Sequence, residues 1–194
     1  MTIGSLPRLR LYTSLTQYIQ AAREYVTGRW REGDIAAAER AIAQKVGARH
    51  AVLTSMARVG IHLALKNTIR PGQKVVCSPY TIVEVVNMIV AAGGVPLFAD
   101  LDDNTCNVSA TSVEELLATH TDVGAVMVTH FYGLACDVVR IRSACDRLGI
   151  PLLEDAAQAF GVTVRGRSVG TFGRAGIFSF GLYKNVNSFY GGAV

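Results

Sequence analysis

The chain has 194 residues, of which half are hydrophobic and 18% are charged, and its formal net charge is +4. This composition is typical of a folded globular chain and excludes an intrinsically disordered one. The basic residues are scattered and the longest apolar stretch, residues 85–95, is short. We therefore expect neither a nucleic-acid-binding surface nor a membrane-spanning segment.

The predicted elements alternate between helices and strands along most of the chain. Residues 1–33 are mixed in composition and are expected to form an N-terminal arm or helix, which leaves 34–194 as one large domain. A helix is predicted from Asp34, with Gly47 as its stop signal. Further helices are expected over residues 59–67, 81–92 and 137–149, and strands over residues 50–54, 75–78, 95–100, 123–129, 151–154 and 176–180.

Two further signals lie between these elements. Ser112 is followed three residues later by Glu115, which has the form of a capping box at a helix start. The four cysteines form no CxxC pair and have no histidine at zinc-binding spacing, so no metal site is expected. The lack of a disulfide framework and of an apolar leader favours a reducing, cytoplasmic location.

Several predicted strands are apolar on both faces, as expected when helices cover both sides of a sheet. The sequence therefore predicts an α/β fold with a mostly parallel sheet. Ligands in such folds bind beyond the carboxyl ends of the strands, so the polar residues that follow strands are the candidates for chemistry. Four such clusters occur, at residues 54–58, 129–133, 154–158 and 179–185.

Asp155 and Lys184 lie in two of these clusters. Most Asp/Lys pairs of this kind are solvated ion pairs. The alternative is a pyridoxal phosphate site, in which the lysine amine forms a Schiff base with the cofactor and the carboxylate keeps the pyridine nitrogen protonated. The pair alone does not decide between these interpretations.

The surrounding motifs resemble the DegT/DnrJ/StrS family of sugar aminotransferases. The resemblance is carried by LEDAAQAFG, SVGTFGRAGIFSFGLYKN and GGAV, and by GARHAVLTSMARVGIHLALKN, SPYTIVEVVNMIVAAGGVPLFADLD and VTHFYGLACD in the same order. It extends over residues 28–194. It implies the large domain of a fold type I pyridoxal-phosphate transferase, with the C-terminal part missing.

The resemblance also implies roles for individual residues. Lys184 would form the bond to the cofactor and then move the proton between cofactor and substrate carbons. Asp155 would pair with the pyridinium nitrogen and Gln158 would contact the ring oxygen. Ser179 would hydrogen-bond the phosphate.

Three residues depart from the family pattern. Ala57 and Arg58 stand where the family has a Gly-Thr phosphate loop at a helix N-terminus, where backbone N–H groups suit a dianion. Arg58 could add a charge-assisted bond or could be an ordinary surface arginine. Ile82 replaces an aromatic residue that stacks on the cofactor ring; Tyr80 is either a substitute for that ring or structural. His130 follows a strand, and a structural role is expected for it.

The resemblance implies transfer of an amino group from an amino acid, commonly glutamate, to a nucleotide-linked keto sugar by a homodimer. Sugar dehydratases of the same family carry His in place of the lysine, and Lys184 argues against that activity. The chain stops in an apolar strand after Gly191 and Gly192, about halfway along the family's length. A cofactor-binding remnant or one half of a split enzyme is therefore the alternative.

Overall fold

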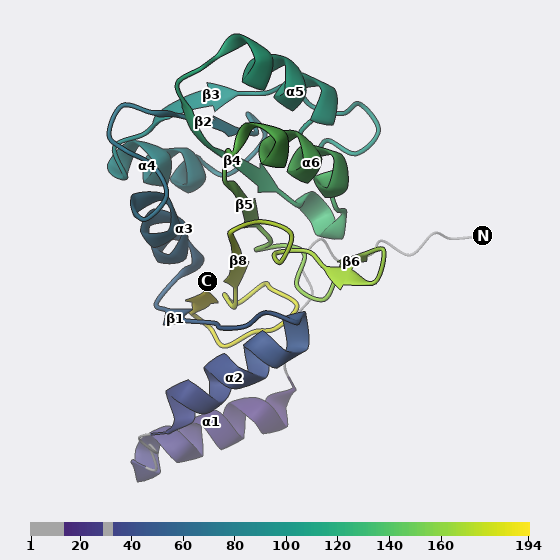
Figure 1. Ribbon diagram of the computed structural model, residues 1–194. Helices are drawn as coiled ribbons and strands as arrows, with labels where there is room; N and C mark the ends of the chain where they lie inside the picture. Colours follow the sequence, from purple (N-terminus) through teal and green to yellow (C-terminus); the bar gives the residue numbers. More distant parts are fainter. Residues whose placement is uncertain (1–13, 29–32) are drawn as a thin grey trace, which may run out of the picture.

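The computed structural model describes residues 14–28 and 33–194. Its main sheet has seven strands in the order β1-β9-β8-β5-β4-β2-β3, and a two-stranded hairpin, β6-β7, stands beside it (Figure 1). The strands are β1 (Leu53–Thr54), β2 (Lys74–Cys77), β3 (Val95–Phe98), β4 (Val123–Thr129), β5 (Leu152–Asp155), β6 (Thr163–Val164), β7 (Arg167–Ser168), β8 (Ala175–Ser179) and β9 (Gly192–Ala193).

Helices connect the successive strands from β1 to β5. Strands β3, β2, β4, β5 and β8 are mutually parallel, whereas β9 runs antiparallel to both β8 and β1. The helices are α1 (Leu15–Thr27), α2 (Asp34–Val46), α3 (Ala57–Lys66), α4 (Val83–Ala91), α5 (Ala110–Thr119), α6 (Val138–Leu148) and the 3₁₀ turn η1 (Phe131–Gly133). The mostly parallel sheet agrees with the sequence prediction.

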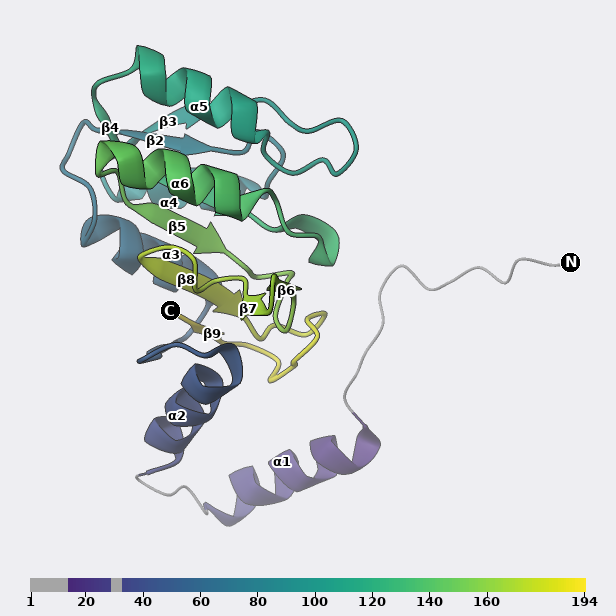
Figure 2. The same cartoon turned by 45° about the vertical axis from the view of Figure 1, so that its right-hand side comes forward.

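Alternate residues of the buried strands pack on opposite faces of the sheet, because strand side chains alternate in direction. Val126 and Leu152 pack with α5 and α6, while Met127 and Leu153 pack with α3 and α4. Figure 2 shows α5 and α6 together on one face. Helices on both faces leave the strand ends as the places where polar side chains can meet a ligand.

The expected helix boundaries hold where a local signal defines them. Gly47 and Gly149 end α2 and α6 in the left-handed conformation, at φ of 76° and 66°, which glycine adopts without steric cost. The first expected strand is shorter than residues 50–54 and half-buried. Within residues 14–28 and 33–194, none of the helices combines the length and apolar character needed to span a bilayer.

The capping box expected at Ser112 is wrong. Helix α5 begins three residues earlier, where the Ser109 side chain accepts the N–H of Ser112. The Ser112 hydroxyl instead accepts the N–H of Asp100 at 2.9 Å. Ser112 therefore ties the chain after β3 to α5, a contact that no local pattern announces.

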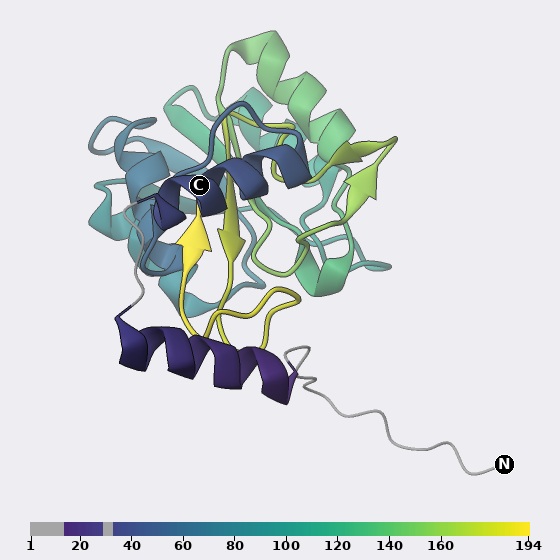
Figure 3. The same cartoon turned by 90° about the horizontal axis from the view of Figure 1, so that it is seen from below.

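The N-terminal arm contains α1, a helix with a capping box between Ser14 and Gln17. Residues 1–13 and 29–32 of the predicted arm lie outside the described part. Figure 3 shows α1 beneath the loop that joins β8 to β9, drawn in yellow. The arm is thus partly helical and touches the segment that carries Lys184.

Candidate functional site

A pocket of about 400 Å³ lies at the carboxyl ends of β5 and β8, a volume within the range of small-molecule sites. Its walls bring together residues that are more than 120 positions apart in the chain. They are Met56, Ala57, Arg58, Ile61, Ile82, Glu84, Val85, Asp155, Ala157, Ser179, Gly181, Leu182, Lys184, Phe189, Tyr190 and Gly191. Six of the seven residues expected at the site are among them.

Asp155 is the last residue of β5, and its carboxylate is buried at the pocket wall. Its Oδ1 accepts the N–H of Ala157 at 3.0 Å, which fixes the carboxylate orientation. Burial raises the pKa of Asp155, and this bond and the charge of Lys184 oppose the shift without reversing it. A carboxylate held this way is stabilised by a cation placed in the pocket.

Lys184 reaches the same pocket from the loop after β8, where its N–H donates to the carbonyl of Gly181 at 3.0 Å. Burial lowers the pKa of the Lys184 amine, and the negative charge of Asp155 opposes this shift. A lowered pKa increases the neutral amine fraction at a given pH, and the neutral amine is the nucleophilic form.

The N-terminal ends of two helices also border the pocket. Helix α3 begins at Ala57 after Met56, and α4 begins at Val83 after Ile82; neither preceding side chain makes a capping hydrogen bond. Both helices present the positive end of their dipoles to this region. With the Ser179 side chain among the lining residues, these helix ends favour an anion such as a phosphate.

Arg58 forms an ion pair with Glu84 across the pocket rim, at 3.5 Å between Nη1 and Oε1. Both side chains line the pocket and remain partly exposed. The sequence left two roles open for Arg58, a phosphate ligand or an ordinary surface arginine. The structure shows that the Glu84 carboxylate would compete with a bound anion for the Arg58 guanidinium. Arg58 can reach an incoming anion after this exposed pair opens, at small energetic cost.

Gly192 brings the end of the loop close to the start of α3. A Cβ atom at this position would lie 2.5 Å from the Ala57 nitrogen and 2.7 Å from its Cα. Gly191, at φ 134°, precedes it in a conformation that side chains rarely adopt. The Gly-Gly pair therefore lets β9 close the pocket beside the helix N-terminus.

One expected residue does not reach the pocket. The Gln158 side chain accepts the N–H of Tyr132 at 3.1 Å and is absent from the pocket walls, so its predicted contact with the cofactor ring stays a prediction. Ile82 lies at the wall with 56% of its surface exposed. Tyr80 instead packs on Phe131, with ring centroids 4.7 Å apart.

Sequence reasoning missed the pocket residues Glu84, Phe189 and Tyr190. Their signal was weak, because a glutamate in a first helical turn and two aromatic residues in a loop have many ordinary roles. The Gly-Gly pair that follows Tyr190 was the usable clue, since paired glycines at a strand mark a close backbone approach.

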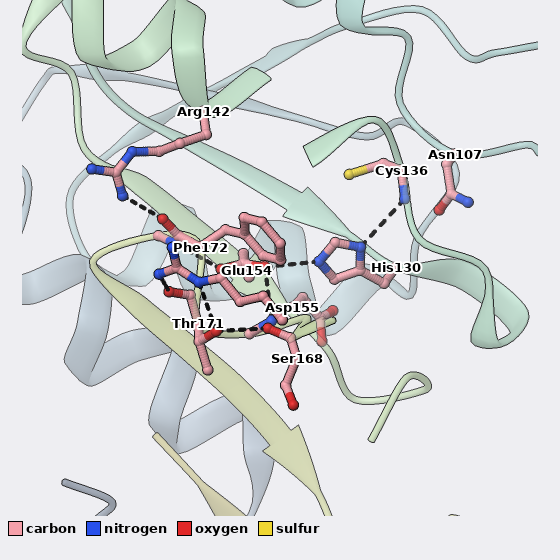
Figure 4. Close-up of polar contacts among 12 residues, drawn as sticks. Asn107, His130, Cys136, Arg142, Glu154, Asp155, Ser168, Thr171 and Phe172 are labelled. Carbon is pink, nitrogen blue, oxygen red and sulfur yellow. Dashed lines mark hydrogen bonds and ion pairs between the residues drawn. The ribbon is translucent and has the colours of Figure 1, made fainter. Parts of the chain in front are cut away.

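His130 has the structural role expected for it. Its Nε2 lies 3.1 Å from Oε2 of Glu154, and both side chains are fully buried (Figure 4). The Glu154 carboxylate also accepts the N–H groups of Gly170 at 2.7 Å and Gly173 at 2.6 Å. This network lies directly behind Asp155, whose carbonyl accepts the His130 N–H at 2.9 Å.

These features fit pyridoxal phosphate, the cofactor that the resemblance implies. Asp155 is placed for a ring cation, Lys184 for an aldehyde, and the α3 N-terminus with Ser179 for a phosphate. Ile82 offers an apolar surface for the ring. Among the described residues, no group of three or more His, Cys, Asp or Glu side chains is arranged to hold a metal ion.

Comparison with solved structures agrees with this fold. The aminotransferase TlmJ from Streptoalloteichus hindustanus superposes with a TM-score of 0.88 at 30% identity, covering 97% of this chain and 52% of that one. The sugar aminotransferase CalS13 from Micromonospora echinospora gives 0.86 at 28% identity, covering 97% and 53%. These similarities confirm the expected fold type I class.

Sequence comparison identifies the family. The chain is 38% identical over 157 residues to the GDP-perosamine synthase of Vibrio cholerae, covering 80% of this chain and 42% of that protein. It therefore spans about two fifths of the length of this curated relative. The family's cofactor is pyridoxal 5'-phosphate. A sequence model of the family matches residues 15–194, and the chain belongs to the DegT/DnrJ/EryC1/StrS aminotransferase family.

Proposed function

We propose that this chain forms the cofactor-binding part of a transaminase that moves an amino group from an amino acid, glutamate, to a nucleotide-linked keto sugar. The observation that carries the proposal is the meeting of Asp155 and Lys184 in one pocket, with the pKa of each shifted by burial toward its neutral form. The relatives named GDP-perosamine synthase and sugar aminotransferase support a sugar as acceptor.

Each pocket residue has a defined task in this proposal. Pyridoxal phosphate, when bound, supplies an aldehyde and an electron-withdrawing ring. The Lys184 amine would hold the cofactor by condensing with that aldehyde with loss of water and, once free, Nζ would carry a proton between the substrate and cofactor carbons. Asp155 would keep the ring nitrogen protonated, while Ser179 and the start of α3 would hold the phosphate.

The proposal is tested by adding pyridoxal phosphate to the purified chain, reducing with borohydride, and locating the adduct by mass spectrometry. We expect the adduct on Lys184 and none in Lys184→Ala. Lys66→Ala, which changes the last residue of α3, is the matched control and should keep the adduct. An adduct spread equally over surface lysines, or retained in Lys184→Ala, contradicts the assignment.

Adding glutamate to the loaded chain then separates two forms of the proposal. Loss of the absorbance band of the lysine-linked cofactor when glutamate is added, with release of 2-oxoglutarate, supports a working first half-reaction. A stable band supports the alternative, a chain that binds the cofactor but needs further residues for turnover.

We also propose that the protein acts as a cytoplasmic homodimer. Apolar side chains are exposed along α3 and α4, at Val59, Leu63, Val83 and Val90, and such surfaces mark contacts between proteins. All four cysteines are free thiols, which suits a reducing compartment. Sedimentation velocity tests the dimer: Leu63→Glu should shift the chain to a monomer, and an unchanged sedimentation coefficient contradicts this interface.

A further inference from the structure

Tyr18 of helix α1 contacts the main domain. Tyr18 is half-buried, whereas every other residue of α1 is exposed, including the apolar Leu15, Ile19 and Val26. An amphipathic helix is usually held by several apolar residues on one face. Tyr18 is the α1 residue whose ring and hydroxyl both contact the 180–191 loop.

Tyr18 contacts the loop that carries Lys184. Its ring lies against that of Phe189, with centroids 5.0 Å apart and planes at 54°. Such tilted aromatic pairs are attractive beyond the area that they bury. The Tyr18 hydroxyl also accepts a hydrogen bond from Nδ2 of Asn187, at 3.4 Å. Figure 3 shows α1 running beneath this loop.

Asn187 joins the two halves of the loop. Its Nδ2 also donates to the carbonyl of Leu182 at 2.9 Å, and its Oδ1 accepts the N–H of Phe189 at 2.7 Å. One amide has two donor hydrogens and can make all three bonds. Leu182 and Phe189 both line the pocket and lie on either side of Lys184 in the sequence.

Phe189 needs external support. Its φ of 67° lies in the left-handed region, where a bulky side chain is strained. Such a conformation persists only where the surrounding structure holds it. The Asn187 Oδ1 atom supports it from within the loop, and the Tyr18 ring supports it from α1.

We propose that Tyr18 is a positioning residue, which holds the 180–191 loop through Asn187 and Phe189 so that Lys184 stays in the pocket. Fixed geometry matters because an amine must approach an aldehyde carbon along a narrow range of directions. The link to the cofactor rests on the proposed function. The ordering of the loop by Tyr18 does not.

Hydrogen–deuterium exchange on the chain without cofactor tests the ordering, because exchange reports local opening. Tyr18→Ala should speed exchange in peptides from 180–191 by about tenfold, while peptides from β4 and β5 keep the parent rate. Tyr18→Phe, which keeps the ring and loses the hydroxyl, should fall between. Ile19→Ala, on the exposed neighbour of Tyr18, is the control and should match the parent. Equal exchange in Tyr18→Ala and Ile19→Ala overturns the proposal.

Covalent attachment of pyridoxal phosphate at Lys184 tests the positioning. The rate of attachment, measured by absorbance and by the borohydride adduct, should fall about tenfold in Tyr18→Ala, and Asn187→Ala should show the same defect. If hydrogen–deuterium exchange in 180–191 rises but the rate of cofactor attachment is unchanged in both variants, Tyr18 orders the loop without positioning Lys184. The positioning role is then wrong. If the parent itself gives no adduct, the proposed function fails while the exchange result still decides the ordering.

Discussion

The imidazole of His130 and the carboxylate of Glu154 form a fully buried hydrogen bond of 3.1 Å between the ends of β4 and β5. His130 Nδ1 accepts the N–H of Cys136 at 3.4 Å, so Nε2 carries the proton that Glu154 accepts. Three donors converge on one carboxylate, and this links the 170–173 loop to the strand that ends in Asp155.

Glu154→Gln should destabilise the fold. The amide has one acceptor oxygen and places an NH₂ donor against donors, so buried N–H groups lose their partner. The expected loss is about 3 kcal/mol of unfolding free energy, measured by urea denaturation. Glu115→Gln, at an exposed site on α5, should change stability by less than about 0.5 kcal/mol. Equal losses of unfolding free energy in the two variants would show that the buried Glu154 carboxylate does not stabilise the fold.

Asp155→Asn should make the cofactor-free chain more stable at neutral pH. Burial raises the pKa of Asp155 above its ordinary 3.8, so this group favours the folded state most below that value. Its contribution is lost as the pH rises through the raised pKa. Urea denaturation over a pH series should show the advantage of Asp155→Asn shrinking as the pH falls. A difference independent of pH contradicts the raised pKa.

The same variant should bind pyridoxal phosphate more weakly than the parent. Losing a hydrogen bond between charged groups corresponds to about tenfold or more in affinity. Fluorescence titration with the cofactor checks this. Asp146→Asn, on the exposed side of α6, is the control that should keep the parent affinity.

The pH dependence of attachment to Lys184 follows from its lowered pKa. The neutral amine reacts, so the rate of attachment should rise with pH and level off below 10.5, the ordinary pKa of a lysine amine. Stopped-flow absorbance measures the profile. A rate that still rises through pH 10.5 would show that the pocket does not lower the pKa of Lys184.

Because Arg58 and Glu84 form an ion pair, neutralising one or the other should change the affinity for the cofactor in opposite directions. If Arg58 binds the cofactor phosphate, Arg58→Gln should weaken binding about tenfold, since a charge-assisted bond is lost. Glu84→Gln should strengthen binding, because it removes the carboxylate that holds Arg58 at 3.5 Å. Titration of both variants decides the matter. Equal affinities in all three proteins indicate an ordinary rim arginine.

Gly192→Ala should disturb the pocket. The added Cβ would meet the backbone of Ala57 at 2.5 Å, and such overpacking costs about 1–3 kcal/mol. Gly60→Ala, within α3, is the matched control, because the nearest atoms to its added Cβ would lie at ordinary contact distances of 3.5 Å or more. We expect a lower melting temperature and weaker cofactor binding for Gly192→Ala alone. Similar behaviour of both variants would contradict the close approach.

Local patterns predicted the elements whose determinants are local. The continuous apolar run of β4 and the glycine stops of α2 and α6 depend on neighbours a few residues away, and their boundaries were predicted within a few residues. The start of α5 was misplaced because Ser109 and Ser112 are both capable caps, and the contact of Ser112 with Asp100 distinguishes them.

The sequence by itself determined the alternation of helices and strands, the family, and the residue types at the ends of β5 and β8. Only the tertiary structure decided which side chains meet. The pairing of Arg58 with Glu84, the turn of Gln158 toward Tyr132, and the contact of Tyr18 with Asn187, 169 positions away, are examples. Such contacts depend on strand order and helix placement, which bring together segments whose separation along the chain carries no information about their distance in space.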